Sequence, residues 1–317
     1  MHLRIVASPE LVDNVIELLR NEPGATNVVH FPGAVQEPSG DMILSDVVRE
    51  GVGGILDSLR ELGVHHTGSI TLQDIDIEIS DAADEADRQS RGSGSDAVLW
   101  DEVEQRTNDE TTLSSSFLIF MSVATMIAGI GVLLDQPILI VGAMVVGPDF
   151  GPLAAVSVGI VRRRPRVILR SLLALVVGYG VGMVLAALLT LLLTAFGLVD
   201  KAMLESPRPL TDFIWEPNAL SWVVGFLAGI AGVLSLTASK SGALIGVLIS
   251  VTTVPAAANA AVALAYGVWP QVGGSLGQLA LNLLAIITGG VLTLAAQRII
   301  LSRTTRGRRE QSLTRMG

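Results

Sequence analysis

The sequence predicts a polytopic α-helical membrane protein that carries a small N-terminal α+β domain. Half of its 317 residues are hydrophobic and only 16% are charged, a composition typical of membrane proteins rather than soluble ones. The charges are unevenly placed, because residues 1–110 hold 23 acidic and 7 basic residues, whereas the remainder holds 7 acidic and 14 basic ones. We therefore expect an acidic soluble part joined to a membrane part with basic flanks. The acidic N-terminal part also argues against nucleic acid as a partner.

The first 80 residues show the element order β-α-β-β-α-β, which predicts a ferredoxin-like cytoplasmic domain. Apolar residues at helical spacing indicate two helices. The first follows the start signal Ser8-Pro9, and the second runs from Val52 to Leu62 and is closed by Gly63. The strands are expected at His2–Ala7, Asn27–Phe31, Met42–Val48 and Ile75–Ile79, with turn signals at Pro32-Gly33 and Pro38–Gly40 between the second and third.

Three further regions complete the predicted organisation. Residues 81–111 read as an acidic linker that is rich in Gly and Ser near its middle and ends in a short amphipathic helix. Residues 112–301 form the membrane domain, and residues 302–317 form a basic cytoplasmic tail. The chain has no cysteine, which excludes a disulfide framework, a thiolate metal site and a cysteine nucleophile. The N-terminus lacks a basic region followed by an apolar core, so no cleaved signal peptide is expected.

Six segments are apolar and long enough to cross a bilayer, which takes about 20 residues. They are residues 115–134, 137–161, 168–197, 220–238, 242–267 and 273–301. With both termini inside, 12 of the 14 basic residues after residue 110 lie on the cytoplasmic side, and only Lys201 and Arg208 lie outside. We therefore expect a multi-pass protein of the cell membrane whose N- and C-termini are both cytoplasmic.

The two halves of the membrane domain resemble each other. Ala128-Gly129-Ile130 recurs as Ala228-Gly229-Ile230, and the Pro152-Leu-Ala-Ala of span two recurs as Pro255-Ala-Ala-Ala in span five. Each half has three spans, an odd number, so the second copy would insert upside down relative to the first. Inverted repeats with broken helices that meet near the bilayer midplane are a recurring transporter architecture. The sequence thus predicts a 3+3 inverted repeat with breaks in spans two and five.

The break in span two lies in the stretch Gly142–Gly159, where prolines, glycines and an acid interrupt an apolar span. A proline inside a helix removes a backbone hydrogen bond, and in lipid the freed groups find no water. An ionisable side chain at this depth is a functional hypothesis in its own right. The alternative is a proline and glycine kink that binds no solute.

We expect a solute or ion site where the two breaks meet near the midplane, with Asp149 opposite the small polar residues of span five. Asp149 has no basic residue at comparable depth, so it would bind a proton or a cation or lie in a water-filled vestibule. The sequence does not decide whether that cation is a metal. The candidate binding residues are Gly142, Gly147, Pro148, Asp149, Gly151, Pro152, Thr252, Thr253, Pro255 and Asn259.

Small and amide residues of the spans are expected to serve helix packing. Span five lacks bulky side chains and should be enclosed by other helices. The pairs Gly178/Gly182, Gly225/Gly229 and Gly242/Gly246 would allow close helix approach. Gln278, Asn282 and Gln297 of span six are interpreted as interhelical hydrogen-bond donors.

The motifs of spans one and two resemble those of the uncharacterised membrane protein family called domain of unknown function 389. The resemblance rests on Leu113-Ser114, on the run Ala128–Leu133, and on Ile140–Met144 leading into Gly147–Pro152. It covers the membrane part to about residue 300, and the N-terminal domain resembles that of the longer family members. The family name implies no established activity.

The leading functional interpretation is a membrane transporter or channel for a small solute or ion, with a regulatory cytoplasmic domain. The alternative is a membrane-anchored sensor or scaffold whose soluble domain binds a ligand or partner. An enzyme is not expected, because all four histidines lie within residues 1–66 and Asp149 is the single carboxylate at mid-depth. We expect no cofactor, and the partners expected are the lipid bilayer, the small solute or ion, and further copies of the chain in a homo-oligomer.

Overall fold

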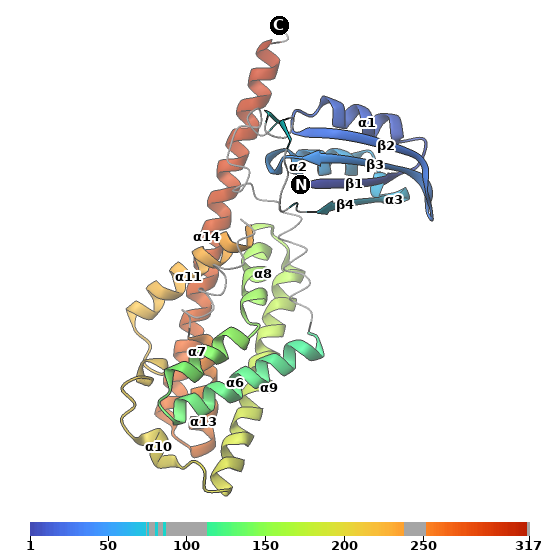
Figure 1. Ribbon diagram of the computed structural model, residues 1–317. Coiled ribbons are helices and arrows are strands. Elements are labelled where there is room, and N and C mark those ends of the chain that lie inside the picture. The colour runs from blue at the N-terminus through green and yellow to red at the C-terminus, as the bar shows by residue number, and fades with distance from the viewer. Residues whose placement is uncertain (74, 76–79, 82–84, 87–112, 238–251, 316–317) are drawn as a thin grey trace. The chain divides into compact units, whose positions relative to one another are not determined.

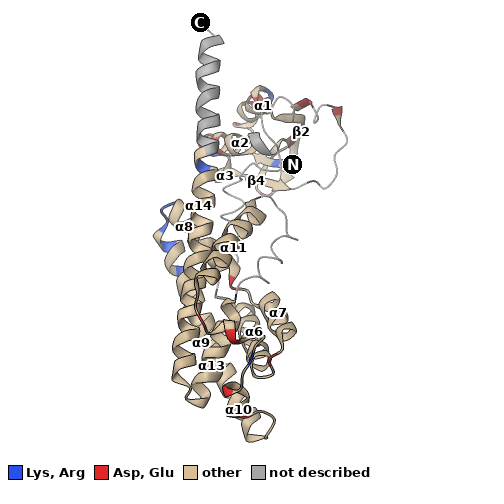
Figure 2. Ribbon diagram, turned by 90° about the vertical axis from the view of Figure 1, so that its left-hand side faces the viewer, with Lys and Arg blue, Asp and Glu red and all other residues tan. Residues whose placement is uncertain are grey.

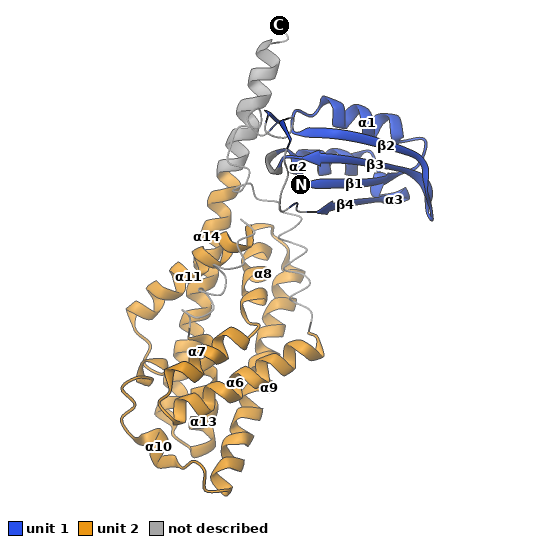
Figure 3. Cartoon of the chain, in the orientation of Figure 1, with its two compact units in different colours: residues 1–101 blue, residues 102–317 orange. Residues whose placement is uncertain are grey.

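The computed structural model describes residues 1–73, 75, 80–81, 85–86, 113–237 and 252–315. The chain divides into two compact units, residues 1–101 and residues 102–317 (Figure 3). The predicted linker and amphipathic helix at residues 81–111 lie almost wholly outside the described residues, as does the first part of predicted span five.

Unit 1 is a small α/β domain with a four-stranded antiparallel sheet (Figure 1). The strands stand in the order β2-β3-β1-β4. Its elements follow the predicted order, with one added short helix: β1 (His2–Ala7), α1 (Val12–Asn21), β2 (Ala25–Gln36), β3 (Ser39–Val47), α2 (Arg49–Glu61), α3 (Val64–Thr67) and β4 (Ser69–Gln73). One buried cluster joins β1 and β3 to both longer helices, so α1 and α2 pack on the same face of the sheet.

Three details of unit 1 differ from the predictions. Helix α1 begins at Val12 rather than Pro9, because the residues after Ser8 first form a turn in which the Leu11 N–H donates to the Ser8 carbonyl. Pro32-Gly33 is no turn, since it lies within β2 at a register shift where Gly33 has a φ of 61°. The fourth strand precedes the predicted Ile75–Ile79, of which only Ile75 is described, outside any strand.

Two His–Asp pairs cross the strands of unit 1. His2 Nδ1 lies 2.9 Å from Asp46 Oδ1, and His30 Nε2 lies 2.7 Å from Asp41 Oδ2. The pKa of Asp41 is lowered by the Gly33 backbone N–H and then by His30. Burial alone would raise the pKa of Asp46, but the hydrogen bonds from His2 and Asn27 outweigh it and leave the pKa lowered.

Unit 2 is helical, and four of its described helices are long and apolar enough to cross a membrane. A fifth crossing is counted if the bent pair α7 and α8 forms one span. The predicted count of six is not confirmed, because the described part of span five is a single helix of 14 residues. The elements are α6 (Ser115–Leu133), α7 (Pro137–Val146), α8 (Phe150–Val161), α9 (Pro165–Ala195), α10 (Lys201–Glu205), η2 (Asp212–Ile214), α11 (Ala219–Thr237), α13 (Thr253–Tyr266) and α14 (Trp269–Arg315).

Helix α13 is enclosed by its neighbours, as its small side chains predicted. Every residue from Thr253 to Ala263 is buried, and α13 packs against α6, α9 and α14. Helix α8 is similarly buried from Phe150 to Gly159. By contrast, α9 exposes many leucine and valine side chains, as a lipid-facing helix does.

The glycines assigned to packing lie at helix crossings. A Cβ added to Gly182 would come within 2.6 Å of Thr125 Oγ1 on α6, and one on Gly225 would come within 2.9 Å of the Ala285 Cβ on α14. One on Gly229 would lie only 2.2 Å from the Ile286 carbonyl oxygen, so no larger residue fits without moving the helices. The pair Gly242/Gly246 falls outside the described residues.

The basic residues of unit 2 gather towards one end (Figure 2). Arg162, Arg163 and Arg164 lie in the turn between α8 and α9, and Arg166 and Arg170 lie at the start of α9. Arg298 of α14 donates to the Val161 carbonyl at the end of α8, at 2.9 Å. The last residues of α9 and α13 meet elsewhere, where the hydroxyls of Thr194 and Tyr266 lie 2.7 Å apart.

Candidate binding site at the helix breaks

The break between α7 and α8 follows directly from its prolines. The residue before a proline is driven out of the helical region, and Gly147 accordingly adopts φ −68° and ψ 125°, which ends α7. Asp149 then stands at the N-cap of α8. Pro152 is the third residue of α8, where its missing N–H leaves no intrahelical bond unmade. The two helices are bent by 54° at this break, as predicted.

Helix α13 begins in the same way. Thr252 stands at its N-cap, and Pro255 is its third residue. The first turn of α13 packs on the break between α7 and α8, since a Cβ on Gly147 would come within 2.8 Å of Val254 Cγ2. The start of α13 and this break therefore meet, and a glycine is needed where they touch.

Asp149 lies in this contact with only 4% of its surface exposed. Its Oδ2 accepts a hydrogen bond of 2.6 Å from the Tyr179 hydroxyl of α9 and one of 2.5 Å from the Thr253 hydroxyl of α13. Among the described residues no basic side chain bonds to it. A buried carboxylate held by two neutral hydroxyls keeps its desolvation cost largely unrelieved, so this position favours binding of a proton or a cation.

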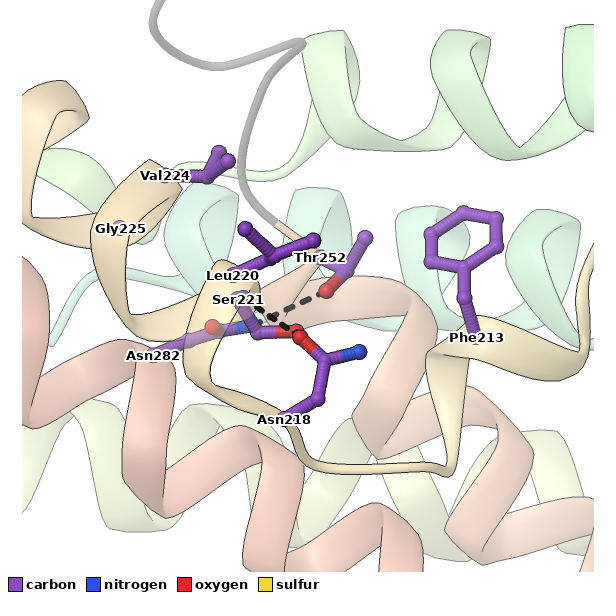
Figure 4. A pocket seen from close by; sticks show the side chains of 8 residues that line it. All are labelled: Phe213, Asn218, Leu220, Ser221, Val224, Gly225, Thr252 and Asn282. Carbon is purple, nitrogen blue, oxygen red and sulfur yellow. Dashed lines mark hydrogen bonds between the residues drawn. The ribbon is translucent and has the colours of Figure 1, made fainter.

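Thr252, the neighbour of Thr253, faces a pocket of about 240 Å³ (Figure 4). The Thr252 hydroxyl accepts from Asn282 Nδ2 at 2.9 Å and from Gln278 Nε2 at 3.5 Å, both on α14. The predicted interhelical role of these two amides is thus confirmed. The pocket lining comes from η2, from the start of α11, and from α13 and α14: Phe213, Asn218, Leu220, Ser221, Val224, Gly225, Thr252 and Asn282.

Asn259 does not face Asp149, contrary to the prediction. It lies six residues after Thr253, about 9 Å along the helix and on another face of it. Its side chain belongs to a second cluster, in which Oδ1 accepts from Arg208 Nη1 at 3.1 Å and Nδ2 donates to Ser275 Oγ at 2.7 Å. The chain between α9 and α11 folds back into the helices and brings Arg208 there.

Arg208 is buried, with 2% of its surface exposed, although it was expected in an outer loop. Its Nη2 donates to Gln271 Oε1 at 3.0 Å, while Asp212 Oδ1 lies 3.8 Å away. Burial lowers the pKa of Arg208, which the carboxylates of Asp212 and Asp135 oppose. Among the described residues, Asp149 and Arg208 are the two buried charged side chains.

The remaining predicted residues divide into two groups. Gly151 and Pro152 are buried in the first turn of α8, and Pro148 is half-buried at the break. Gly142 is exposed on α7, with nothing within 4 Å of a Cβ placed on it. The structure therefore brings Gly147, Asp149 and Thr253 together and leaves Gly142 and Asn259 apart from them.

Sequence reasoning missed several residues of this region. Tyr179 is one of only two tyrosines in the chain and stands within an apolar span, a signal that could have marked it as a partner for a buried acid. Arg208 carries no such pattern, because only the folding back of its loop makes it buried. No group of three or more potential metal-ligating His, Cys, Asp or Glu side chains was found in the described residues.

Residues 144–288 match the family described as "Domain of unknown function (DUF389)". The chain thus resembles this family. The matched segment runs from the end of α7 to the middle of α14, so it contains both breaks, Tyr179, Arg208 and the pocket. Neither a curated protein nor a solved structure matches the chain.

Proposed function

We propose that the protein is a membrane transporter or channel for a small solute or ion, with its site where the two broken segments meet. The observation that carries the proposal is the buried contact between the starts of α8 and α13, which places the Asp149 carboxylate against Thr253 beside a pocket. Irregular backbone and a charge are tolerated within a membrane chiefly where they serve a polar cavity or pathway. Unit 1 is the proposed regulatory domain, on the cytoplasmic side.

The same proposal includes six spans in a 3+3 inverted repeat, which two pairs of equivalent contacts support. Tyr179 lies 30 residues after Asp149, and Asn282 lies 30 residues after Thr252, and each donates to its partner. The contact of Thr125 with Gly182, between the first and third helix of one half, has its counterpart in that of Gly225 with Ala285.

The packing of whole helices supports the same correspondence between the two proposed halves. Helix α8 packs against α9 and α14, and α13 packs against α14 and α9. Helix α6 packs against α9 as α11 packs against α14. If α6, α8 and α9 are exchanged with α11, α13 and α14, each of these helix contacts is thus replaced by another contact of the same set.

Both termini are proposed to be cytoplasmic, together with the basic turn Arg162–Arg170. The bond from Arg298 to Val161 supports a common side for this turn and the end of the apolar part of α14. Cysteines introduced at Ser93 and Ser312 should then resist a membrane-impermeant thiol reagent in intact cells. Labelling of either one from outside contradicts the orientation.

Asp149 is the proposed coupling residue, through binding of a proton or a cation. Purified protein in liposomes should take up at least one member of a panel of labelled inorganic ions and small organic solutes, with a rate that depends on pH or on a cation. Asp149→Asn keeps the shape of the side chain and removes its charge, so uptake should lose that dependence. Asp200→Asn, at an exposed helix cap in the same unit, is the matched control and should behave as wild type.

Two outcomes count against the proposal. If no solute enters above the level of empty liposomes, transport is wrong. If Asp149→Asn retains the wild-type dependence on pH and cations, the coupling role is wrong and Asp149 only holds the helix break through its hydrogen bonds.

A further inference from the structure

One face of α14 is polar over its first half. Gln271, Ser275, Gln278 and Asn282 follow one another at spacings of four, three and four residues, which places them on one face of a helix over about 16 Å. Ser275, Gln278 and Asn282 are each at least 98% buried. Their bonds run to Asn259 and Thr252, so this face is turned towards α13 and away from lipid.

This polar face joins the two clusters described above. Gln271 and Ser275 belong to the Arg208 cluster, whereas Asn282 lines the pocket. Gln278 lies between them. The Arg208 Nε and the Gln278 Oε1 are buried and have no hydrogen-bond partner among the described residues. Buried polar atoms of native proteins are nearly always paired. The Arg208 Nε can donate to an anionic oxygen, whereas the Gln278 Oε1 is an acceptor and pairs only with a donor such as a hydroxyl, an amide or a water.

Arg208 supplies a positive charge that close carboxylates do not neutralise. Its terminal nitrogens are held by the amide oxygens of Asn259 and Gln271. Asp212 Oδ1, its ion-pair partner, is 3.8 Å from Nη2, and the Asp212 side chain is 39% exposed. A guanidinium held mainly by neutral oxygens can exchange them for an anionic group, which it binds more strongly.

The pocket at the other end of the polar face offers donors. The Asn218 Oδ1 already accepts from the backbone N–H and hydroxyl of Ser221, at 2.9 Å and 3.2 Å, so its NH₂ group remains available. The Thr252 oxygen already accepts two amide donors, so its own hydrogen remains free to donate. Figure 4 shows Asn218 and Thr252 on neighbouring sides of the pocket, with Phe213 beside them.

The lining also restricts the size and shape of the ligand. Phe213, Leu220 and Val224 provide an apolar wall, and none of the described lining residues is charged. A volume of about 240 Å³ admits a compact molecule only. Donors on one side and an apolar wall on the other fit a short-chain carboxylate better than an inorganic cation or an amine.

We propose that the pocket binds a small organic carboxylate, which the charge of Arg208 at the other end of the polar face attracts to this region. This inference rests on the proposed transport function and names the class of its solute. Asn218 and Thr252 hold the carboxylate in the pocket. Asp149 lies behind Thr253, so its neutralisation by a bound proton or cation would remove the repulsion between the two carboxylates.

The test is binding to the full chain in detergent, with propionate, propionamide and propylamine as ligands of nearly the same shape. Calorimetric titration should detect propionate and give much weaker binding for the amide and the amine. Asn218→Asp keeps the oxygen that caps α11 through Ser221, but it replaces the donor with a negative charge, so propionate affinity should fall about tenfold or more. Asn14→Asp adds the same charge at an exposed site of unit 1 and should leave the affinity unchanged.

A second variant shows whether a loss of binding in Asn218→Asp comes from misfolding. Thr252→Val keeps the shape of the side chain and removes the hydroxyl, so it should also weaken propionate binding while leaving the unfolding temperature of the unliganded protein within a few degrees of wild type. Equal binding of all three ligands, or unchanged propionate affinity in both variants, overturns the inference. If propionate fails to bind while liposomes take up another solute, the inference is wrong and the transport function stands. If propionate binds but no solute enters liposomes, the site stands and the transport function fails.

Discussion

The starts of α8 and α13 have similar backbone structures, but their N-cap side chains differ in charge and in hydrogen-bond partners. Each begins at an N-cap that accepts a hydrogen bond from a residue 30 positions later on a long helix, and each has proline as its third residue. At α8 the N-cap is a buried carboxylate, Asp149, held by hydroxyls. At α13 it is a half-buried hydroxyl, Thr252, held by amides beside a pocket. The start of α8 thus holds a buried charge, whereas the start of α13 borders open space.

The largest effect should distinguish two glycines of similar sequence context, Gly229 in α11 and Gly129 in α6. In Gly229→Ala the new Cβ would meet the Ile286 carbonyl at 2.2 Å, which forces α11 and α14 apart and should cost about 3 kcal/mol of unfolding free energy. In Gly129→Ala it meets only a Val262 methyl group at 3.3 Å, and the gain in helix propensity of roughly 1 kcal/mol offsets the strain. Thermal unfolding in one detergent compares the two. Equal losses would show that the halves pack alike at these positions.

The next largest effect is expected at the break between α7 and α8, where Asp149 is the N-cap. Tyr179→Phe removes a donor to a buried carboxylate, and hydrogen bonds to charged groups contribute about 2 kcal/mol. Thr253→Val should cost a similar amount, because it removes the second donor to the same oxygen. The double variant measured in the same unfolding assay should lose more than the sum of the two, since it leaves Asp149 without either hydroxyl. Simple additivity would indicate that the two donors act independently.

Substitutions around Thr252, the uncharged N-cap of α13, should lower the unfolding free energy by a smaller amount. Asn282→Leu removes an amide donor to Thr252, and a neutral hydrogen bond contributes about 1 kcal/mol. Gln278 donates to the same hydroxyl and should limit the loss. Unfolding measurements on Asn282→Leu and Tyr179→Phe compare equivalent positions directly. A larger loss for Asn282→Leu would contradict the assignment of the critical charge to the first half.

The smallest effect is expected at a carboxylate outside the membrane part. The lowered pKa of Asp46 means that its ionised form stabilises unit 1 at pH values above the usual aspartate pKa. This contribution, below about 1 kcal/mol for a partly exposed pair, is lost as the pH falls through the lowered pKa. Hydrogen exchange of the β1 and β3 amides should therefore be faster in Asp46→Asn than in wild type at pH 7. A difference that stayed constant as the pH fell through the lowered pKa of Asp46 would contradict the ionic origin.

The sequence predicted whatever depends on local chemistry. Pro148 and Pro152 placed the break correctly because proline restricts the backbone wherever it stands, and the strands predicted at His2–Ala7 and Met42–Val48 correspond to β1 and β3. The predicted enclosure of α13 is also confirmed, because a helix without bulky apolar side chains makes few contacts with lipid tails. The contact of Asp149 with Thr253 was anticipated in part, through the matched prolines of the two halves.

Features set by chain folding at a distance were not predicted. The burial of Arg208 depends on a loop that turns back between helices, and its sequence resembles any polar connection. Asn259 was assigned to Asp149 because both are polar residues at similar depth, whereas the helical rotation between Thr253 and Asn259 turns it towards Arg208. Pro32-Gly33 was predicted to form a turn, but proline and glycine also occur at bulges within strands. Periodicity alone does not separate bulges from turns.

The enclosure of α13 has a consequence for how the protein is made. At 14 residues this helix is about 21 Å long, shorter than the bilayer core of roughly 30 Å, and it carries Asn259 at its middle. Alone in lipid it would have no helix to pair that amide. Gly267, with a φ of 71°, turns the chain directly from α13 into α14, whose Ser275 and Gln271 are the partners of Asn259. During biosynthesis α13 and α14 therefore have to enter the membrane together as a helical hairpin, and α14 completes the insertion of the helix before it.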